Sequence, residues 1–306
     1  MMSREPYVSL CIPTNGVMEW VVPVLDSIYA EKCDTDNFEV VVTDNGQNFD
    51  FQNAMEEYQN RYSNLIYKKT DAQLFQNQVE AFKLARGQLI KFVNHRMTLL
   101  SGTVEYLIAF VKKYTETKPM AYFSNGMLNL HDKVKECSSF DEYVRTLSYW
   151  SSWSAGTAIW KSHFEQMNLD QPFNGYFPHT DIVFFEKSGD KYIVDDTVLM
   201  QEIPADVTKK GSYDLFDAFA VQYPTIIQQL YVERAVTKKT YEFIKRKNGF
   251  FVSDLYLQYM IKKRPCSYNL DGYDQAVGKY YGNIEIKVKA VLLEIKYILK
   301  KIVRGK

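Results

Sequence analysis

The sequence lacks the patterns that mark several well-known classes of protein. Its four cysteines (Cys11, Cys33, Cys137 and Cys266) form no C-x-x-C pair, which argues against a structural zinc site and favours free thiols in a reducing compartment. No stretch reaches the roughly 18 uncharged apolar residues of a transmembrane helix, and no signal-peptide segment precedes the first predicted strand. We therefore expect a cytoplasmic protein.

The sequence also lacks an excess of either charge. Its 306 residues include 37 Lys and Arg and 37 Asp and Glu, and this balance argues against a general nucleic-acid binder. There is no internal repeat and no glycine-rich phosphate loop near the N-terminus, and the second absence counts against a nucleotidyltransferase. With 46% hydrophobic residues, the chain can build one large core or two smaller ones.

The first hundred residues alternate between strand and helix patterns. Short apolar runs predict strands over 7–12, 38–42, 65–68 and 89–93, and helical spacing predicts helices over 18–30, 51–62 and 77–85. Gly87 would follow the last of these helices as its C-cap. This order predicts an α/β fold with a mostly parallel sheet flanked by helices, in which ligands bind beyond the carboxyl ends of the strands.

Beyond residue 100, the predicted elements become shorter and then mainly helical. We expect strands over 120–124, 127–130, 157–160 and 192–194, and helices over 104–114, 142–149 and 181–188. From about 205 onward only helical patterns occur, over 215–223, 225–236, 238–247, 253–262 and 283–304. We therefore expect a nucleotide-binding domain over 1–204 and a helical C-terminal region over 205–306.

Three segments, in order and at matching spacing, resemble the family 2 glycosyltransferases of GT-A fold. They read VSLCIPTN at 8–15, FEVVVTDNG at 38–46 and ARGQLIKFV at 85–93. The resemblance implies a Rossmann-like GT-A domain that transfers a sugar from a nucleotide-sugar donor with inversion.

The resemblance also implies which residues bind the nucleoside. Thr14 would line the pocket, and Asp44 would accept a hydrogen bond from the base, normally from N3–H of uracil or thymine. The alternative for Asp44 is a tight turn with no ligand. The implied nucleotide-binding residues are Pro13, Thr14, Asn15, Asp44, Asn45 and Gln73.

The sequence departs from the family at the usual D-x-D motif, which holds Mn²⁺ or Mg²⁺ against the donor diphosphate. Asn94, His95 and Arg96 stand there instead and would face the diphosphate. Three explanations remain open. Arg96 or a nearby Lys neutralises the leaving group without a metal; His95 and the Asn94 carbonyl hold a metal weakly; or the protein has lost catalysis.

The resemblance places the catalytic base, which takes the proton of the attacking acceptor hydroxyl, within 177–185. Asp181 is the candidate, and its alternative role is to cap a helix. His179 is a candidate contact of the acceptor, or a plain loop histidine. Trp153, in the Ser- and Trp-rich loop 150–156, is a candidate sugar contact, or a core residue.

The last predicted helix is basic and amphipathic. Residues 284–306 carry a net charge of +5, and apolar residues recur at helical spacing. This pattern predicts peripheral contact with the inner face of a membrane, the alternative being docking on the protein's own body. The aromatic-rich helices over 213–262 favour a homodimer interface.

Together, these patterns predict transfer of a sugar from a UDP- or dTDP-sugar to a lipid-linked or polysaccharide acceptor, as in the assembly of bacterial cell-surface polysaccharides. The alternative is a non-catalytic sugar-nucleotide-binding or assembly protein that has kept the fold. The missing carboxylates favour this alternative, and Asp181 opposes it.

Overall fold

The computed structural model describes residues 5–204 and 211–304, without the side chain of Arg304. The chain divides into two compact units, Met1–Ile203 and Pro204–Lys306. Within the described ranges, no helix combines the length and apolar character needed to cross a membrane.

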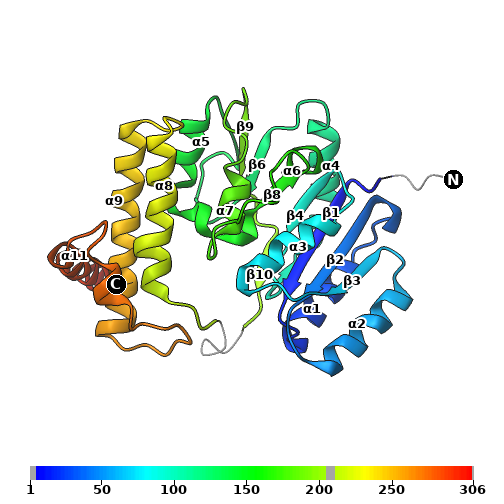
Figure 1. Cartoon of the computed structure of the whole chain (residues 1–306), viewed down its shortest axis with the longest axis horizontal. Helices are drawn as coiled ribbons and strands as arrows, with labels where there is room; N and C mark the ends of the chain where they lie inside the picture. The colour runs from blue at the N-terminus through cyan, green and yellow to red at the C-terminus, as the bar shows by residue number, and fades with distance from the viewer. Residues whose placement is uncertain (1–4, 205–210, 305–306) are drawn as a thin grey trace. The chain divides into compact units, whose positions relative to one another are not determined.

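The first unit is built around a five-stranded sheet in the order β3-β2-β1-β4-β8 (Figure 1). Its strands are β1 (Val8–Thr14), β2 (Phe38–Asp44), β3 (Leu65–Lys69), β4 (Leu89–Phe92) and β8 (Ala158–Trp160). The first four are parallel, and β8 runs antiparallel to β4. The runs VSLCI and FEVVV are buried throughout, as expected for parallel strands covered on both faces.

Helices connect these strands and set the places where the strands end. They are α1 (Met18–Tyr29), α2 (Phe49–Arg61), α3 (Asn77–Leu84) and, after β4, α4 (Thr103–Tyr114). Asn48 caps α2, because its side-chain oxygen accepts from the N–H groups of Asp50 and Phe51. The register pairs Thr14 with Asp44, so the carboxyl ends of β1 and β2 lie side by side.

The rest of the first unit adds a smaller sheet and short helices. Strands β6 (Met120–Phe123), β9 (Tyr192–Asp195) and β7 (Val134–Cys137) form the order β6-β9-β7, and a bridge from Tyr122 to Thr157 leads toward β8. Strand β5 (Met97–Leu99), just after Arg96, pairs with β10 (Met200–Glu202). Helices α5 (Phe140–Leu147) and α7 (Pro178–Val183) complete the part that matters for the site.

The second unit is helical in its described residues. Helices α8 (Tyr223–Val232) and α9 (Lys238–Leu255) lie side by side (Figure 1), and each has a π-helical neighbour, η6 (Asp217–Gln222) and η7 (Tyr256–Ile261). Short α10 (Tyr273–Ala276) and long α11 (Asn283–Arg304) follow. The core of this unit includes Phe216, Val252, Tyr273, Tyr281 and Ile286.

The predicted α/β class with a mostly parallel sheet is confirmed, and several local predictions are wrong. Residues 127–130 form turns rather than a strand, and the helix predicted over 181–188 is α7, which starts at Pro178 and ends at Val183. Gly87 is not a C-cap, since Ala85 ends α3. Gly87 instead passes close to β1, where a Cβ would lie 2.6 Å from the Ser9 nitrogen.

Candidate active site

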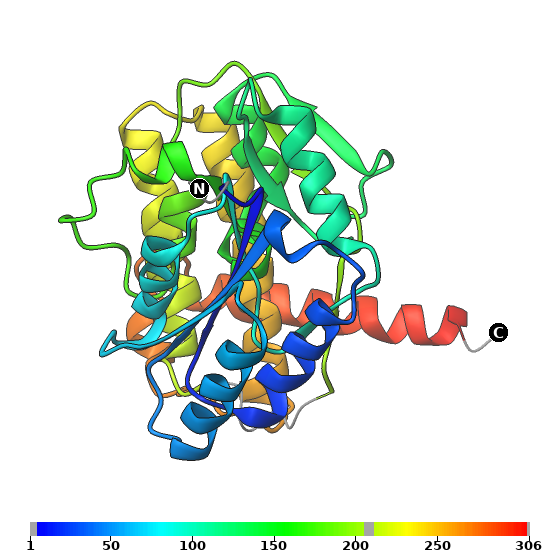
Figure 2. The ribbon, with the colours of Figure 1, turned by 90° about the vertical axis from the view of Figure 1, so that its right-hand side faces the viewer.

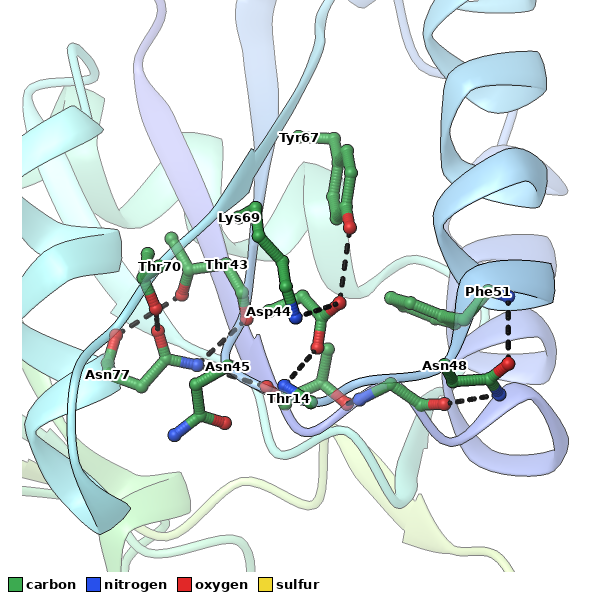
Figure 3. A network of polar contacts seen from close by, with 12 residues as sticks. Thr14, Thr43, Asp44, Asn45, Asn48, Phe51, Tyr67, Lys69, Thr70 and Asn77 are labelled. Carbon is green, nitrogen blue, oxygen red and sulfur yellow. Dashed lines mark hydrogen bonds and ion pairs between the residues drawn. The ribbon is translucent and has the colours of Figure 1, made fainter.

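Asn77, the first residue of α3, joins the carboxyl ends of β1 and β2 (Figure 3). Its Nδ2 donates to the carbonyl oxygens of Thr14 (3.0 Å) and Thr43 (2.9 Å). Its Oδ1 accepts from the Thr70 hydroxyl (2.8 Å). Because Asn77 is buried and paired at both ends, it fixes the two strand ends relative to each other. The sequence analysis assigned it no role, since one Asn at a helix start is common.

Asp44 is fully buried at the end of β2 and is held by two hydrogen-bond donors and one ion pair (Figure 3). Its Oδ1 accepts from the Gly46 N–H (2.7 Å), and its Oδ2 accepts from the Tyr67 hydroxyl (3.1 Å). Lys69 Nζ lies 3.5 Å from Oδ2 and forms an ion pair. Asp44 therefore closes a turn and also carries a charged partner from β3, which a plain turn does not need.

The other implied nucleoside residues lie around these two strand ends. The Asn45 N–H donates to the Thr14 carbonyl (3.1 Å), and its side chain donates to the Ala72 carbonyl (2.8 Å). Asn15 is exposed and Pro13 is half-buried. Gln73 is exposed and donates to the Asp71 carbonyl (3.2 Å) just before the turn η2 (Leu74–Gln76).

His95 ties the end of β4 to the end of β1. Its Nδ1 lies 2.9 Å from Thr14 Oγ1, and its ring meets Trp20 of α1 edge-on at 5.1 Å. Burial lowers the pKa of His95 to about 3, with the nearby Arg96 charge as a smaller cause. His95 is therefore neutral at physiological pH and can act on a diphosphate only as a hydrogen-bonding group.

Arg96 is the cation at this end of the sheet. Its guanidinium lies 5.4 Å from the centre of the Trp20 ring, and its Nη1 is buried with no hydrogen-bond partner in the described part of the chain. The Arg96 N–H donates to Asn94 Oδ1 (3.0 Å), so the Asn94 side chain closes the turn that presents Arg96. A guanidinium nitrogen can donate to an anion, but this one is inaccessible, so the side chains that cover it must move before an anion can reach it.

These residues do not fit a divalent-cation site. The position of the expected D-x-D motif offers no carboxylate. The imidazole of His95 could ligate a metal, but Arg96 places a positive charge beside it. Within 5–204 and 211–304, no three His, Cys, Asp or Glu side chains gather closely enough to hold a metal ion. The side-chain oxygen of Asn94 is already used in the turn.

Asp181 lies in the first turn of α7 and is linked through Asn174 to Gln76, just before α3. Its Oδ2 accepts from the Asn174 N–H (2.6 Å), and the Asn174 carbonyl accepts from Gln76 Nε2 (3.2 Å). Burial raises the pKa of Asp181 to about 6, although the Asn174 N–H and the Lys187 charge oppose this shift. A carboxylate with a pKa near 6 is suited to accept a proton near neutral pH.

The Trp-bearing loop forms two short turns, η3 (Ser148–Ser152) and η4 (Ser154–Gly156), and side chains of β6 and β4 donate to its carbonyls. The Tyr122 hydroxyl donates to the carbonyls of Trp150 and Trp153, and Lys91 donates to the Ala155 carbonyl. Both Trp side chains are half-buried, so neither is a fully buried core residue.

His179 is buried beneath this loop. Its Nε2 lies 2.9 Å from the Ser152 carbonyl and donates to it, while the buried Nδ1 has no partner among the described residues. Burial lowers the pKa of His179 to about 4, so the ring is neutral. His179 therefore holds the Trp loop against the start of α7, next to Asp181.

The chain has a GT-A type fold, and solved glycosyltransferases of that fold are similar to it. TarS 1–349 from S. aureus in complex with UDP-GlcNAc is 13% identical, with a TM-score of 0.59 over 89% of this chain and 80% of that chain. The mannosyltransferase PcManGT from Pyrobaculum calidifontis, in complex with GDP-Man and Mn²⁺, is 15% identical, with a TM-score of 0.53 over 97% and 88%. No curated protein matches the chain.

Residues 9–153 match the model of the family described as Glycosyl transferase family 2. These residues form a family 2 glycosyltransferase domain, which supports assignment of the chain as a transferase. The resemblance that the sequence motifs indicated is confirmed.

Proposed function

We propose that the chain transfers a sugar, with inversion, from a uridine or thymidine diphosphate sugar to a hydroxyl of a lipid-linked or polysaccharide acceptor. The observation that carries this proposal is the contact between His95 Nδ1 and Thr14 Oγ1 at 2.9 Å. It joins the nucleoside end of the sheet at β1 and β2 to the cationic end of β4, so one ligand can meet both.

Asp44 and Lys69 are proposed to select the base. Uracil, thymine and guanine each present a ring N–H beside a carbonyl, which a carboxylate and an ammonium group recognise together. The Asp44 side chain and the Lys69 ammonium nitrogen are both inaccessible, so side chains at this end must move for a base to reach them. In support, TarS has been solved with UDP-GlcNAc and with UDP, and PcManGT with GDP-Man.

Arg96 is proposed to bind the diphosphate in place of a metal ion. A guanidinium carries a permanent charge and can donate two parallel hydrogen bonds to phosphate oxygens. Its buried Nη1 has no partner in the described residues, and Asn94 fixes the turn that presents it. His95, being neutral, would add a hydrogen bond but no charge.

Asp181 is proposed as the catalytic base of a single displacement. The acceptor oxygen attacks the anomeric carbon, its proton passes to the Asp181 carboxylate, and the nucleoside diphosphate leaves with the electron pair of the broken bond. His179 is proposed as a positioning residue, because its bond to Ser152 holds the loop that carries Trp153. Trp153, half-buried on that loop, is the proposed sugar contact.

The test is turnover of UDP-, dTDP- and GDP-sugars with EDTA and with added Mn²⁺. We expect release of UDP or dTDP in EDTA, and faster release when an acceptor is added. Release that requires Mn²⁺ would contradict the role of Arg96. Nucleotide binding with no turnover under any condition would favour the alternative, a sugar-nucleotide-binding protein. Preference for GDP-sugars would leave the proposed site in place but change the nucleobase that it binds to guanine.

A further inference from the structure

Helix α11 packs on the second unit with one face only. Ile286 and Ala290 are buried, and Glu294 forms an ion pair with Lys262 after η7. The Tyr297 hydroxyl donates to Asp254 of α9 (3.0 Å), and Lys289 lies over the ring of Phe250. Figure 2 shows the helix, in red, continuing past α9. The packed face therefore lies along the line 286–290–294–297.

The opposite face of α11 is apolar and open. Nine of its aliphatic side chains are 49–79% exposed. They are Ile284, Val288, Val291, Leu292, Ile295, Ile298, Leu299, Ile302 and Val303. At 100° per residue these positions occupy one arc of about 140°. Leaving such a large aliphatic surface in water is unfavourable, which marks it as a binding surface.

Lysines border this arc on both sides. At the same helical spacing, Lys296 and Lys300 lie beside one edge of the arc and Lys287 lies beside the other, and all three are exposed. No Asp or Glu occurs in the sequence after Glu294. Lys306 and the side chain of Arg304 lie outside the described residues. An apolar stripe with basic edges is the pattern of a helix that lies in the surface of an anionic membrane.

We infer that the exposed face of α11 binds an anionic lipid surface, with the helix lying along it. A second copy of the chain fits less well. The arc includes Leu292, Leu299 and Val303 and is wider than the a/d seam of a coiled coil. Two copies in parallel would also bring like-charged lysines together, whereas anionic headgroups attract them. This inference goes beyond the proposed transfer reaction and does not depend on it.

The test is flotation of the full-length chain with vesicles of phosphatidylglycerol and phosphatidylcholine in equal parts, and with phosphatidylcholine alone. We expect binding to the anionic vesicles that weakens with salt. The triple variant K287Q/K296Q/K300Q should bind roughly 100-fold more weakly, since each lysine contributes about a fivefold factor. Ile295→Asp with Ile302→Asp should abolish binding. A matched control, Ile261→Asp, changes an exposed aliphatic residue outside the arc and should bind normally.

Light scattering of the same proteins completes the test. Equal binding to both vesicles would overturn the charge-based choice of an anionic surface. A wild-type oligomer that binds no vesicle, and that Ile295→Asp with Ile302→Asp converts to a monomer, would assign the face to a second copy. A monomer that binds neither vesicle would also overturn the inference. Circular dichroism of each variant checks that it is folded.

Discussion

The two ends of the candidate site are built differently. At the nucleoside end, Asp44 and Asn77 are buried with polar partners on both side-chain atoms. At the diphosphate end, Arg96 keeps a buried nitrogen without a hydrogen-bond partner in the described ranges, and His95 is neutral. The first end is complete without a ligand, whereas the second keeps a donor that a bound anion would satisfy. We therefore propose that the protein holds the phosphates of its donor through Arg96 rather than through a metal ion.

Asp181→Asn should have the largest effect, which is on kcat. Nucleotide binding at the two ends of the site should stay unchanged, so the variant separates binding from catalysis. Loss of a positioned base should lower kcat by about 10²- to 10⁴-fold. The amide still accepts the hydrogen bond of the Asn174 N–H, so the loop should stay in place. The measurements are sugar transfer by product analysis and UDP binding by calorimetry. A variant with near-native kcat would show that another group takes the proton.

Arg96→Met comes next and tests the diphosphate end alone. A hydrogen bond to a charged group contributes about 1.5–3 kcal/mol, so UDP affinity should fall roughly 10- to 150-fold while uridine affinity is unchanged. Arg61→Met removes the same charge from exposed α2 and serves as the control. If Arg96→Met bound UDP as tightly as the control, Arg96 would not bind the diphosphate and the proposed difference between the two ends would be wrong.

Asn77→Ala tests the nucleoside end. It removes donors to the Thr14 and Thr43 carbonyls and leaves the Thr70 hydroxyl without its acceptor. We expect the free energy of unfolding to fall by about 1–3 kcal/mol, measured by urea denaturation. Asn168→Ala changes an exposed turn and should cost much less. Equal losses in the two variants would mean that Asn77 does not hold the strand ends together.

The pH dependence of kcat/KM should give the smallest effect. Asp181 must be ionised to accept a proton, and burial raises its pKa to about 6. Activity should therefore rise with pH through about 6 and then level off. At one unit below that pKa, about a tenth of the activity should remain. His95 and His179 are neutral above pH 5, so their titration should not change kcat/KM in this pH range. A profile flat down to pH 5 would contradict the assignment.

Much of the fold could be predicted from the sequence because the signals were local. The runs YVSLCI and FEVVV are too apolar and too short for anything but buried strands. Strand β7 (Val134–Cys137) was missed because Lys135 and Glu136 interrupt its apolar residues and only Cys137 is buried, and β5 because it has three residues. The helix predicted over 181–188 was misplaced, since Pro178 starts a helix of only one or two turns.

The site was only partly predictable, for a physical reason. Motif spacing located Thr14, Asp44 and Asp181, but their partners come from distant positions. Lys69 reaches Asp44 across the β2–β3 pairing, and Asn174 meets Asp181 through a loop with no regular pattern. His179 was expected near the acceptor, and only the folded structure reveals its bond to the Ser152 carbonyl.

The most direct test of the account is calorimetric titration of the wild-type chain with UDP, in EDTA and again in Mn²⁺. The account predicts binding in EDTA, with a dissociation constant that Mn²⁺ leaves unchanged, because Arg96 supplies the charge that a metal would otherwise provide. Binding that appears only with Mn²⁺, or no binding of UDP in either buffer, would contradict it.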